Sequence, residues 1–204
     1  MSTTSDSAVK SALRARLIAA RSAIPPAERE AASRSIASHL ASLPAWQRAR
    51  TVALHQALGA EVETAELARL AIAAGKRVAW PRVSAAGPVM EFATCATSEL
   101  VPGPARALEP PRSAPSIPLE SIDLVVVPGV AFDARGGRLG RGRGHYDATL
   151  SLLRPDAARV GIAFDEQVVD SVPTEPHDVP LDVVVTSSRL LFAAADRVDT
   201  VPDA

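Results

Sequence analysis

The segment LVVVPGVAFDARGGRLGRGRGHYDATLSLL, residues 124–153, decides the fold. It opens with an apolar, mostly β-branched run, Leu124–Val127, which is typical of a strand buried on both faces of a parallel sheet. A stretch rich in glycine and arginine follows at 134–144, and residues 145–153 read as a helix. This succession of strand, loop and helix indicates one unit of an α/β fold.

Alternating strands and helices are predicted on both sides of this segment. Short apolar runs predict strands at residues 51–56, 77–80, 89–92, 159–163 and 183–186. Helical spacing of apolar residues predicts helices at 7–20, from about 26 to 43, and at 64–74. Because strands that alternate with helices form mostly parallel sheets, we expect an α/β fold of three layers. Its centre would be a Rossmann-like open sheet, mostly parallel and flanked by helices.

Proline and glycine mark the expected boundaries. Pro44 should end the second helix, Gly75 should cap the third at its C-terminus, and Pro81 should stop the strand that begins at Arg77. The stretch 101–118 contains six prolines, which predicts a stiff, irregular connection that wraps one domain. We therefore expect a single domain over residues 1–204, with loose termini at 1–6 and 196–204.

Composition narrows the class of protein. The chain has 204 residues, 47% of them hydrophobic, and a formal net charge of -1, which argues against a nucleic-acid binder that works by bulk charge. No apolar run suits a membrane span, and the N-terminus has no signal-peptide pattern. Cys95 is the single cysteine, so an internal disulfide and a cysteine-based metal site are excluded. We expect a cytoplasmic, monomeric protein with neither nucleic acid nor membrane as a partner.

The glycine- and arginine-rich loop, Ala134–Gly144, predicts a phosphate site. It contains five glycines, which let backbone N–H groups converge on an anion, and four arginines, which donate to phosphate oxygens. The loop follows a predicted strand at the sheet edge where α/β proteins bind ligands, and the next helix points its N-terminus there. It is not a standard P-loop, because Arg143 and Gly144 replace the required lysine and hydroxyl. The alternative is a solvated arginine-glycine segment, although such segments are usually terminal and repetitive.

Two carboxylates outside the loop are candidate magnesium ligands. Asp147 falls in the first turn of the predicted helix, and Asp178 lies in a proline-bounded loop. Magnesium at a nucleotide site commonly takes one or two carboxylates, with phosphates and water completing the shell. The alternative is that Asp147 complements the helix dipole and Asp178 caps a turn.

Several motifs together resemble the 5-formyltetrahydrofolate cyclo-ligase (methenyltetrahydrofolate synthetase) family. They are VPGVAFD at 127–133, GRLGRGRGHYD at 137–147, GIAF at 161–164 with Gln167, and the block from Val172 to Asp178. The weaker matches are Lys10-x-x-x-Arg14 and EVET at 61–64. The resemblance spans roughly residues 8–192. It implies that ATP phosphorylates the formyl oxygen of 5-formyltetrahydrofolate, that nitrogen 10 then attacks, and that 5,10-methenyltetrahydrofolate, ADP and phosphate are released.

The resemblance also implies roles for individual residues. Lys10 and Arg14 would contact the ATP phosphates, Asp147 and Asp178 would support magnesium, and Gln56 and Glu61 would face the folate. Arg141 and Tyr146 are the predicted catalytic residues. The nucleotide loop would comprise Arg138, Leu139, Gly140, Arg141, Gly142, Arg143, Gly144, His145 and Tyr146, with Arg141 to His145 also facing the folate.

This sequence departs from the family pattern at two positions. His145 stands where an aromatic ring is common, and Arg143 stands where glycine or lysine is more usual. Two other classes stay open: an enzyme of related fold that acts on a sugar phosphate or coenzyme A ester, and a non-catalytic nucleotide- or RNA-binding module. Outside the motifs, His55 is expected to pack rather than react, and Trp46 and Trp80 are expected in the core or at its rim.

Overall fold

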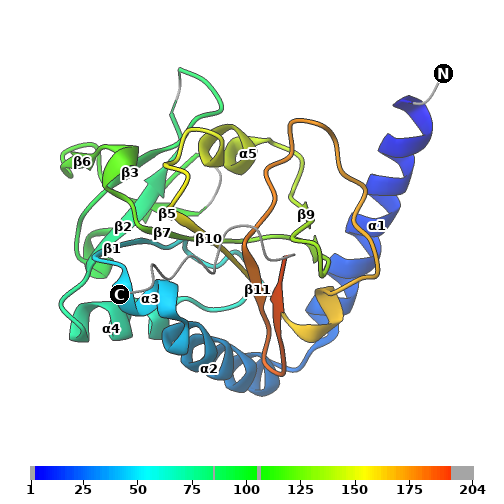
Figure 1. Cartoon of the computed structure of the whole chain (residues 1–204), viewed down its shortest axis with the longest axis horizontal. Helices are drawn as coiled ribbons and strands as arrows, with labels where there is room; N and C mark the ends of the chain where they lie inside the picture. The colour runs from blue at the N-terminus through cyan, green and yellow to red at the C-terminus, as the bar shows by residue number, and fades with distance from the viewer. Residues whose placement is uncertain (1–2, 85, 105–106, 194–204) are drawn as a thin grey trace, which may run out of the picture.

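A central sheet of eight strands organises the molecule (Figure 1). The computed structural model describes residues 3–84, 86–104 and 107–193. Across the sheet the strands run β12 (Leu190–Phe192), β11 (Val183–Val185), β10 (Ala158–Ile162), β7 (Leu124–Val127), β1 (Thr51–Ala53), β2 (Arg77–Arg82), β3 (Glu91–Ala93) and β6 (Ser116–Ile117). The predicted α/β class, with a mostly parallel sheet flanked by helices, is confirmed.

Helices and two small hairpins surround the sheet. The hairpins pair β4 (Val101–Pro102) with β5 (Leu108–Glu109), and β8 (Ala131–Phe132) with β9 (Arg138–Leu139). The helices are α1 (Thr3–Ala23), α2 (Pro26–Ser42), α3 (Pro44–Arg48), α4 (Ala65–Ala73) and α5 (His145–Leu150), with single 3₁₀ turns η1 (Thr97–Glu99), η2 (Leu119–Ser121) and η3 (Asp165–Gln167). A bilayer crossing would need a long, continuously apolar helix, and the described part of the chain contains none.

The strand order places a crevice between β1 and β7. Strands β2, β1, β7, β10 and β11 are mutually parallel, so the chain winds outward from β1 on one side and from β7 on the other. In doubly wound sheets the loops at such a switch point diverge, and ligands bind in the crevice beyond the carboxyl ends of the strands. The segments after β1 and after β7 are therefore placed to form a site.

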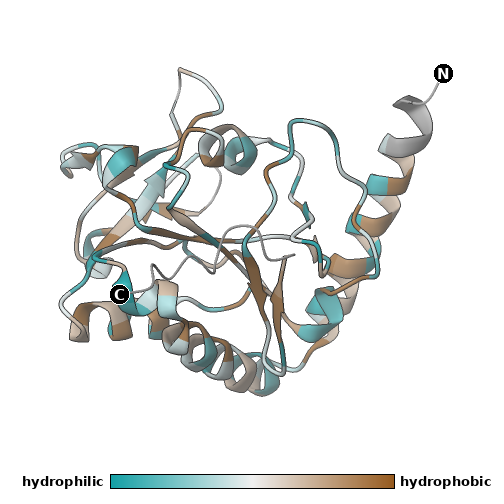
Figure 2. Cartoon of the chain, in the orientation of Figure 1, coloured by the Kyte–Doolittle hydropathy of each residue, from teal (hydrophilic) through white to brown (hydrophobic). Residues whose placement is uncertain are grey.

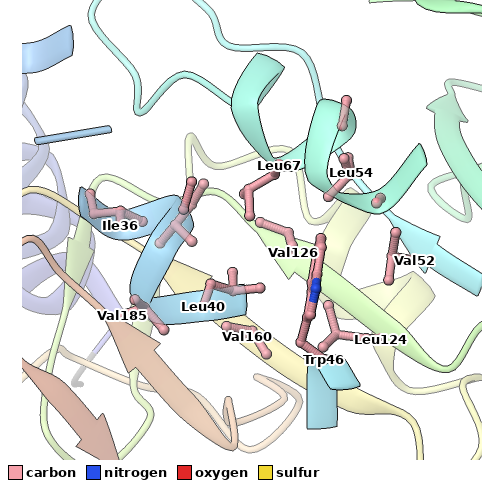
Figure 3. Close-up of a cluster of buried hydrophobic side chains, with 14 of the residues drawn as sticks. Ile36, Leu40, Trp46, Val52, Leu54, Leu67, Leu124, Val126, Val160 and Val185 are labelled. Atoms are coloured by element: carbon pink, nitrogen blue, oxygen red, sulfur yellow. The ribbon is translucent and has the colours of Figure 1, made fainter. Parts of the chain in front are cut away.

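Alternate residues of each strand enter different cores. In β7, Leu124 and Val126 belong to one cluster of buried side chains, whereas Val125 and Val127 belong to another. This follows from the two-residue period of a strand, and it explains why β7 is apolar throughout. The first cluster lies under α2, α3 and α4, as Figure 3 shows for Ile36, Leu40, Trp46, Val52, Leu54, Leu67, Leu124, Val126, Val160 and Val185.

The opposite face of the sheet is covered by α5, by the chain that follows it and by Phe132 of the β8–β9 hairpin. Figure 2 shows apolar residues along the central strands β7, β10 and β11. Helix α1 packs separately, because Leu17 joins Val130, Ala131 and Leu139 in a third cluster on the β8–β9 hairpin. This contact brings the N-terminal helix to the carboxyl edge of the sheet.

Several predicted boundaries were wrong. Strand β2 continues through Pro81 to Arg82; its parallel partner β1 has already ended there, while the antiparallel partner β3 pairs on the other side. Pro44 does end α2, but it also starts α3. Helix α5 ends at Leu150 rather than Leu153. The proline-rich stretch 101–118 contains β4, β5 and β6 rather than irregular structure alone.

Other expectations hold. Gly75 has φ 70° and its N–H donates to Ile72 O, while Lys76 N–H donates to Ala71 O, which is the hydrogen-bond pattern of a glycine C-cap. Trp46 and Trp80 are both buried in the core. The expectation of loose termini is not tested: helix α1 begins at Thr3, inside the segment 1–6, and the segment 196–204 lies outside the described residues.

Candidate active site

One cavity of about 780 Å³ lies at the switch point of the sheet. Its walls come from α1, from the loop after β1, from the end of β2 and the segment that follows it, from β5, from the loops around β9 and before α5, and from the segment around residues 175–178. All the predicted site residues line it: Lys10, Arg14, Gln56, Glu61, Arg138, Leu139, Gly140, Arg141, Gly142, Arg143, Gly144, His145, Tyr146, Asp147 and Asp178. The fold therefore brings together residues from four distant parts of the chain.

The first half of the glycine- and arginine-rich loop supplies the turn and strand β9 of the β8–β9 hairpin. Its second half crosses the cavity mouth in bends. Gly142 and Gly144 have φ of 91° and 68°, which side chains with a Cβ rarely adopt. No N–H from Arg141 to Gly144 donates a hydrogen bond to another described residue, so these amides are available to an anion. Helix α5 has only six residues, so its dipole adds less than expected.

Three cations of the cavity pair with carboxylates. Lys10 Nζ lies 2.6 Å from Glu175 Oε1, and Arg138 Nη2 lies 2.8 Å from Asp147 Oδ1. The hydrogen bond from Lys10 lowers the pKa of the Glu175 carboxyl below its usual range. The third pair joins Arg141 to Glu61 across the cavity mouth, with Nη2 2.7 Å from Oε1.

The other two arginines of the site, Arg14 and Arg143, make no ion pair with a carboxylate among the described residues. Arg14 donates from Nε to the Gly140 carbonyl oxygen at 2.9 Å, which ties the glycine- and arginine-rich loop to α1. Arg143 is exposed, and its guanidinium makes no hydrogen bond or ion pair within the described ranges. Both residues line the cavity, and both guanidinium groups keep N–H donors that have no partner among the described residues.

Glu61 lies between two guanidinium groups. Beyond Arg141, its Oε1 is 3.8 Å from Nη2 of Arg21, and its Oε2 accepts the Leu58 N–H at 3.0 Å. Arg21 is 3% exposed and also donates to the Gly129 carbonyl oxygen. Sequence reasoning missed Arg21, although its spacing of seven residues from Arg14 puts both on the same face of a helix.

Tyr146 and His145 close the cavity beside the loop. Burial raises the pKa of the Tyr146 phenol, so the hydroxyl stays neutral in the ordinary pH range. The Arg138 guanidinium carbon lies 5.7 Å from the centre of the Tyr146 ring. His145 Nδ1 is 2.9 Å from the Pro88 carbonyl oxygen, which anchors the start of α5 to the connection between β2 and β3.

The two predicted metal ligands are neighbours. Asp147 Oδ1 is 3.5 Å from the N–H of Val179, the residue after Asp178. Asp178 Oδ2 accepts the Glu175 N–H at 2.7 Å. Among the described residues, no group of three or more His, Cys, Asp or Glu side chains is arranged so that it could hold a metal ion. The site thus offers two carboxylates, which suits a magnesium ion that keeps water and phosphate ligands but not a metal held by protein alone.

Several cavity residues were not predicted. Glu175 pairs with Lys10, and Glu109 lines the wall near β2. His55 was expected only to pack; it is buried, but it also lines the cavity. Burial lowers the pKa of its imidazole, so the ring is neutral at physiological pH. Glu109 belongs to none of the motifs, and Glu175 lies inside the block from Val172 to Asp178 but was given no role there.

The fold and the cavity define an α/β protein of the doubly wound kind, with a cavity at its switch point that is lined by arginine, lysine and carboxylate side chains. The sequence profile of the 5-formyltetrahydrofolate cyclo-ligase family matches residues 6–187. The chain belongs to this family.

Individual relatives agree. The chain is 34% identical over 191 residues to a 5-formyltetrahydrofolate cyclo-ligase of Mycolicibacterium smegmatis, covering 90% of this chain and 96% of that protein. It is 34% identical to the protein of the same name in Escherichia coli K12, covering 83% and 96%. The solved structure of Aquifex aeolicus 5,10-methenyltetrahydrofolate synthetase superposes with a TM-score of 0.81 at 30% identity, over 94% of this chain and 96% of that one.

Proposed function

We propose that this enzyme converts 5-formyltetrahydrofolate to 5,10-methenyltetrahydrofolate, with ATP converted to ADP and phosphate. The observation that carries the proposal is the convergence of Lys10, Arg14 and the loop 138–144 on one cavity in a chain of this family. In the proposed reaction the formyl oxygen attacks the γ-phosphorus of ATP, and ADP leaves. Nitrogen 10 then attacks the activated formyl carbon and loses its proton to solvent, and the carbon–oxygen bond breaks to release phosphate.

The cavity supplies what this chemistry needs. Transfer of a phosphoryl group requires positioned cationic donors around its oxygens, and the protein need not form a covalent bond with the substrate. Arg14, Arg141 and the N–H groups of 141–144 are such donors, and Arg141 is the proposed catalytic arginine. Tyr146 is proposed to act as a neutral hydrogen-bond donor or packing surface, because burial keeps its phenol protonated.

The two ends of the cavity suit two different ligands. Lys10, Glu175 and Asp178 meet at the α1 end, which we assign to the triphosphate. The other end, beyond His145, is lined by the apolar side chains of Pro81, Val83, Met90 and Leu108. We assign it to the folate ring system. Gln56, Glu61 and the loop from Arg141 to His145 lie between these ends and would face both ligands.

Asp147 and Asp178 are the proposed holders of magnesium. Both line the α1 end, and each has a carboxylate oxygen that makes no hydrogen bond to another described residue. A magnesium ion bound there would neutralise charge on the phosphates. The chain's own contribution is to fix both carboxylates, through Arg138 and through the Glu175 N–H.

A coupled assay tests the proposal. Purified protein should generate the near-ultraviolet absorbance of 5,10-methenyltetrahydrofolate from 5-formyltetrahydrofolate only when MgATP is present. Absence of turnover across a range of pH would reject the activity. Thermal stabilisation by sugar phosphates but not by MgATP would favour an enzyme of the other class, and steeply salt-dependent RNA binding would favour a binding module.

We further propose that the enzyme acts as a cytoplasmic monomer. One chain supplies the whole cavity wall described above, so the proposed site needs no second subunit. Light scattering of the purified protein at working concentration tests the monomeric state.

A further inference from the structure

A second glutamate, Glu109 on β5, lies in the apolar end of the cavity. The residue is only 6% exposed, yet it lines the cavity beside Val83, Met90 and Leu108. Its one hydrogen bond among the described residues is from the Val83 N–H, at 3.3 Å to Oε2. A carboxylate in apolar surroundings normally needs several donors, so this one is placed to receive more from a ligand.

The position of Glu109 is held by its surroundings. A Cβ added to Gly103 would lie 2.3 Å from Cδ of Glu109, the carbon of its carboxyl group. The backbone at Gly103, next to β4, therefore packs directly against this side chain. On its other side, Val83 follows directly after β2. The side chain is thus confined between two backbone segments, with the cavity as its open side.

Glu61 is already engaged and suits this role less well. Its Oε1 receives two hydrogen bonds from Arg141 and lies near Arg21, and its Oε2 accepts the Leu58 N–H. A ligand that needs two carboxylate oxygens would have to displace Arg141. Glu109 makes no ion pair among the described residues. The charges of Arg112 and Arg82 lie near enough to favour its ionised form, but Arg112 is exposed and Arg82 pairs with Glu91.

We propose that Glu109 binds the 2-amino-4-oxo edge of the folate pteridine ring, accepting hydrogen bonds from N3–H and the 2-amino group. These two donors are adjacent and parallel, which matches the two oxygens of one carboxylate. Adenine offers only its 6-amino group on that edge, next to an acceptor nitrogen, so it fits the same carboxylate poorly. This inference rests on the proposed function, because it takes a reduced folate as the second ligand.

The electrostatics agree with the geometry. Burial raises the pKa of the Glu109 carboxyl, and the Val83 N–H and the nearby Arg112 and Arg82 only partly offset this, so the surrounding protein disfavours the charged form. A ligand that supplies two N–H donors would restore the hydrogen bonds lost from water. Sites built to hydrogen-bond a ligand discriminate strongly against analogues that lack the donor.

Binding measurements on the full chain test the inference. Isothermal titration with 5-formyltetrahydrofolate, in the presence of a non-hydrolysable ATP analogue, would compare the wild type with Glu109→Gln and Glu109→Leu. The exposed Glu120→Gln serves as the matched control. We expect both Glu109 variants to weaken folate binding by roughly 10- to 100-fold and to leave affinity for the ATP analogue within about twofold. Circular dichroism would confirm that each variant is folded, and the Gln variant is the closer isostere should the Leu variant fail.

A folate analogue without the 2-amino group separates recognition from packing. The wild type should bind it more weakly than 5-formyltetrahydrofolate, and the Glu109 variants should lose little further affinity for it. Unchanged folate affinity in a folded Glu109 variant, a loss confined to the ATP analogue, or no folate binding by the wild type would each overturn the inference. Normal Glu109-dependent folate binding without MgATP-dependent turnover would reject only the proposed reaction, and turnover with unchanged folate affinity would reject only the role of Glu109.

Discussion

Arg141 donates two hydrogen bonds, from Nε at 3.1 Å and from Nη2 at 2.7 Å, to the same oxygen of Glu61. The two residues are 80 positions apart in the chain, and they meet at the mouth of the cavity. Arg21 approaches the same oxygen from the buried side. Glu61 therefore connects an exposed, loop-borne cation to one that the core holds in place.

Arg141→Ala should reduce turnover by about 100- to 1000-fold, because a positioned donor to the transferring phosphoryl group is lost. The Arg141 side chain is 48% exposed, so the free energy of unfolding should fall by about 1 kcal/mol or less. Steady-state kinetics and urea unfolding measure the two effects. Arg135→Ala is the matched control, since Arg135 is in the same loop but does not line the cavity. Normal activity with a large loss of stability would contradict a catalytic role.

Glu61→Gln should lower the free energy of unfolding by about 2–3 kcal/mol, because Arg21 is left as a buried charge without its carboxylate. The double variant with Arg21→Met should lose less than the sum of the two single changes. Urea unfolding of the three variants gives the coupling energy, which we expect at about 1–2 kcal/mol. Strict additivity would show that the two side chains do not interact.

Asp147→Asn should raise the magnesium concentration needed for half-maximal activity at saturating ATP, since one of two proposed carboxylate ligands loses its charge. A magnesium titration of the wild type and the variant measures this. Asp156→Asn, at an exposed carboxylate that pairs with Arg154 outside the cavity, is the control. An unchanged titration would remove Asp147 from the metal site.

Glu109→Gln should stabilise the ligand-free protein at neutral pH but not in acid. Burial raises the folded-state pKa of Glu109, so the folded protein favours the protonated carboxyl. That contribution is complete below the ordinary carboxyl pKa of about 4.3 and is lost as pH rises through the higher folded-state value. Urea unfolding from about pH 4 to about pH 8 should show that the free energy of unfolding of the variant rises relative to that of the wild type as pH increases. A constant difference across this range would mean that Glu109 does not titrate differently in the folded state.

Tyr146→Phe should lower turnover without altering the shape of the pH–rate profile on its alkaline side. Burial raises the pKa of Tyr146, so the phenol does not ionise in the range of the assay and cannot act as a base. The profile of kcat/KM against pH tests this. Loss of an alkaline limb in the variant would show that the tyrosine titrates during the reaction.

The central sheet and the glycine- and arginine-rich loop could be predicted because both leave local patterns in the sequence. Strand β7, Leu124–Val127, is apolar at every position and is buried on both faces, so the residue types alone indicate a central strand. The boundaries at Pro81 and Leu150 could not be predicted from local rules. Whether a proline interrupts a strand depends on which neighbour has already ended, and that is a property of the sheet as a whole.

In the candidate site, too, some residues could be predicted from local sequence patterns and others could not. Lys10, Arg14 and the loop 138–144 belong to motifs, so their convergence on one cavity could be anticipated from the family resemblance. Arg21 and Glu109 belong to no motif that we recognised. Their importance comes from burial and from partners far away in the chain, such as Glu61 for Arg21 and Val83 for Glu109. Neither quantity can be read from residue types alone.

The three ion pairs Lys10–Glu175, Arg138–Asp147 and Arg141–Glu61 have a consequence for selectivity. Each cation of these pairs already has a counter-charge within the protein, so a chloride or a single phosphate gains little by binding to it. A polyanion can replace several of these carboxylates as partners of the three cations at the same time, and a metal ion that it carries can bind carboxylates that are released. We therefore expect simple anions to compete only at Arg14, Arg143 and the N–H groups of 141–144, and to leave the three paired cations largely undisturbed.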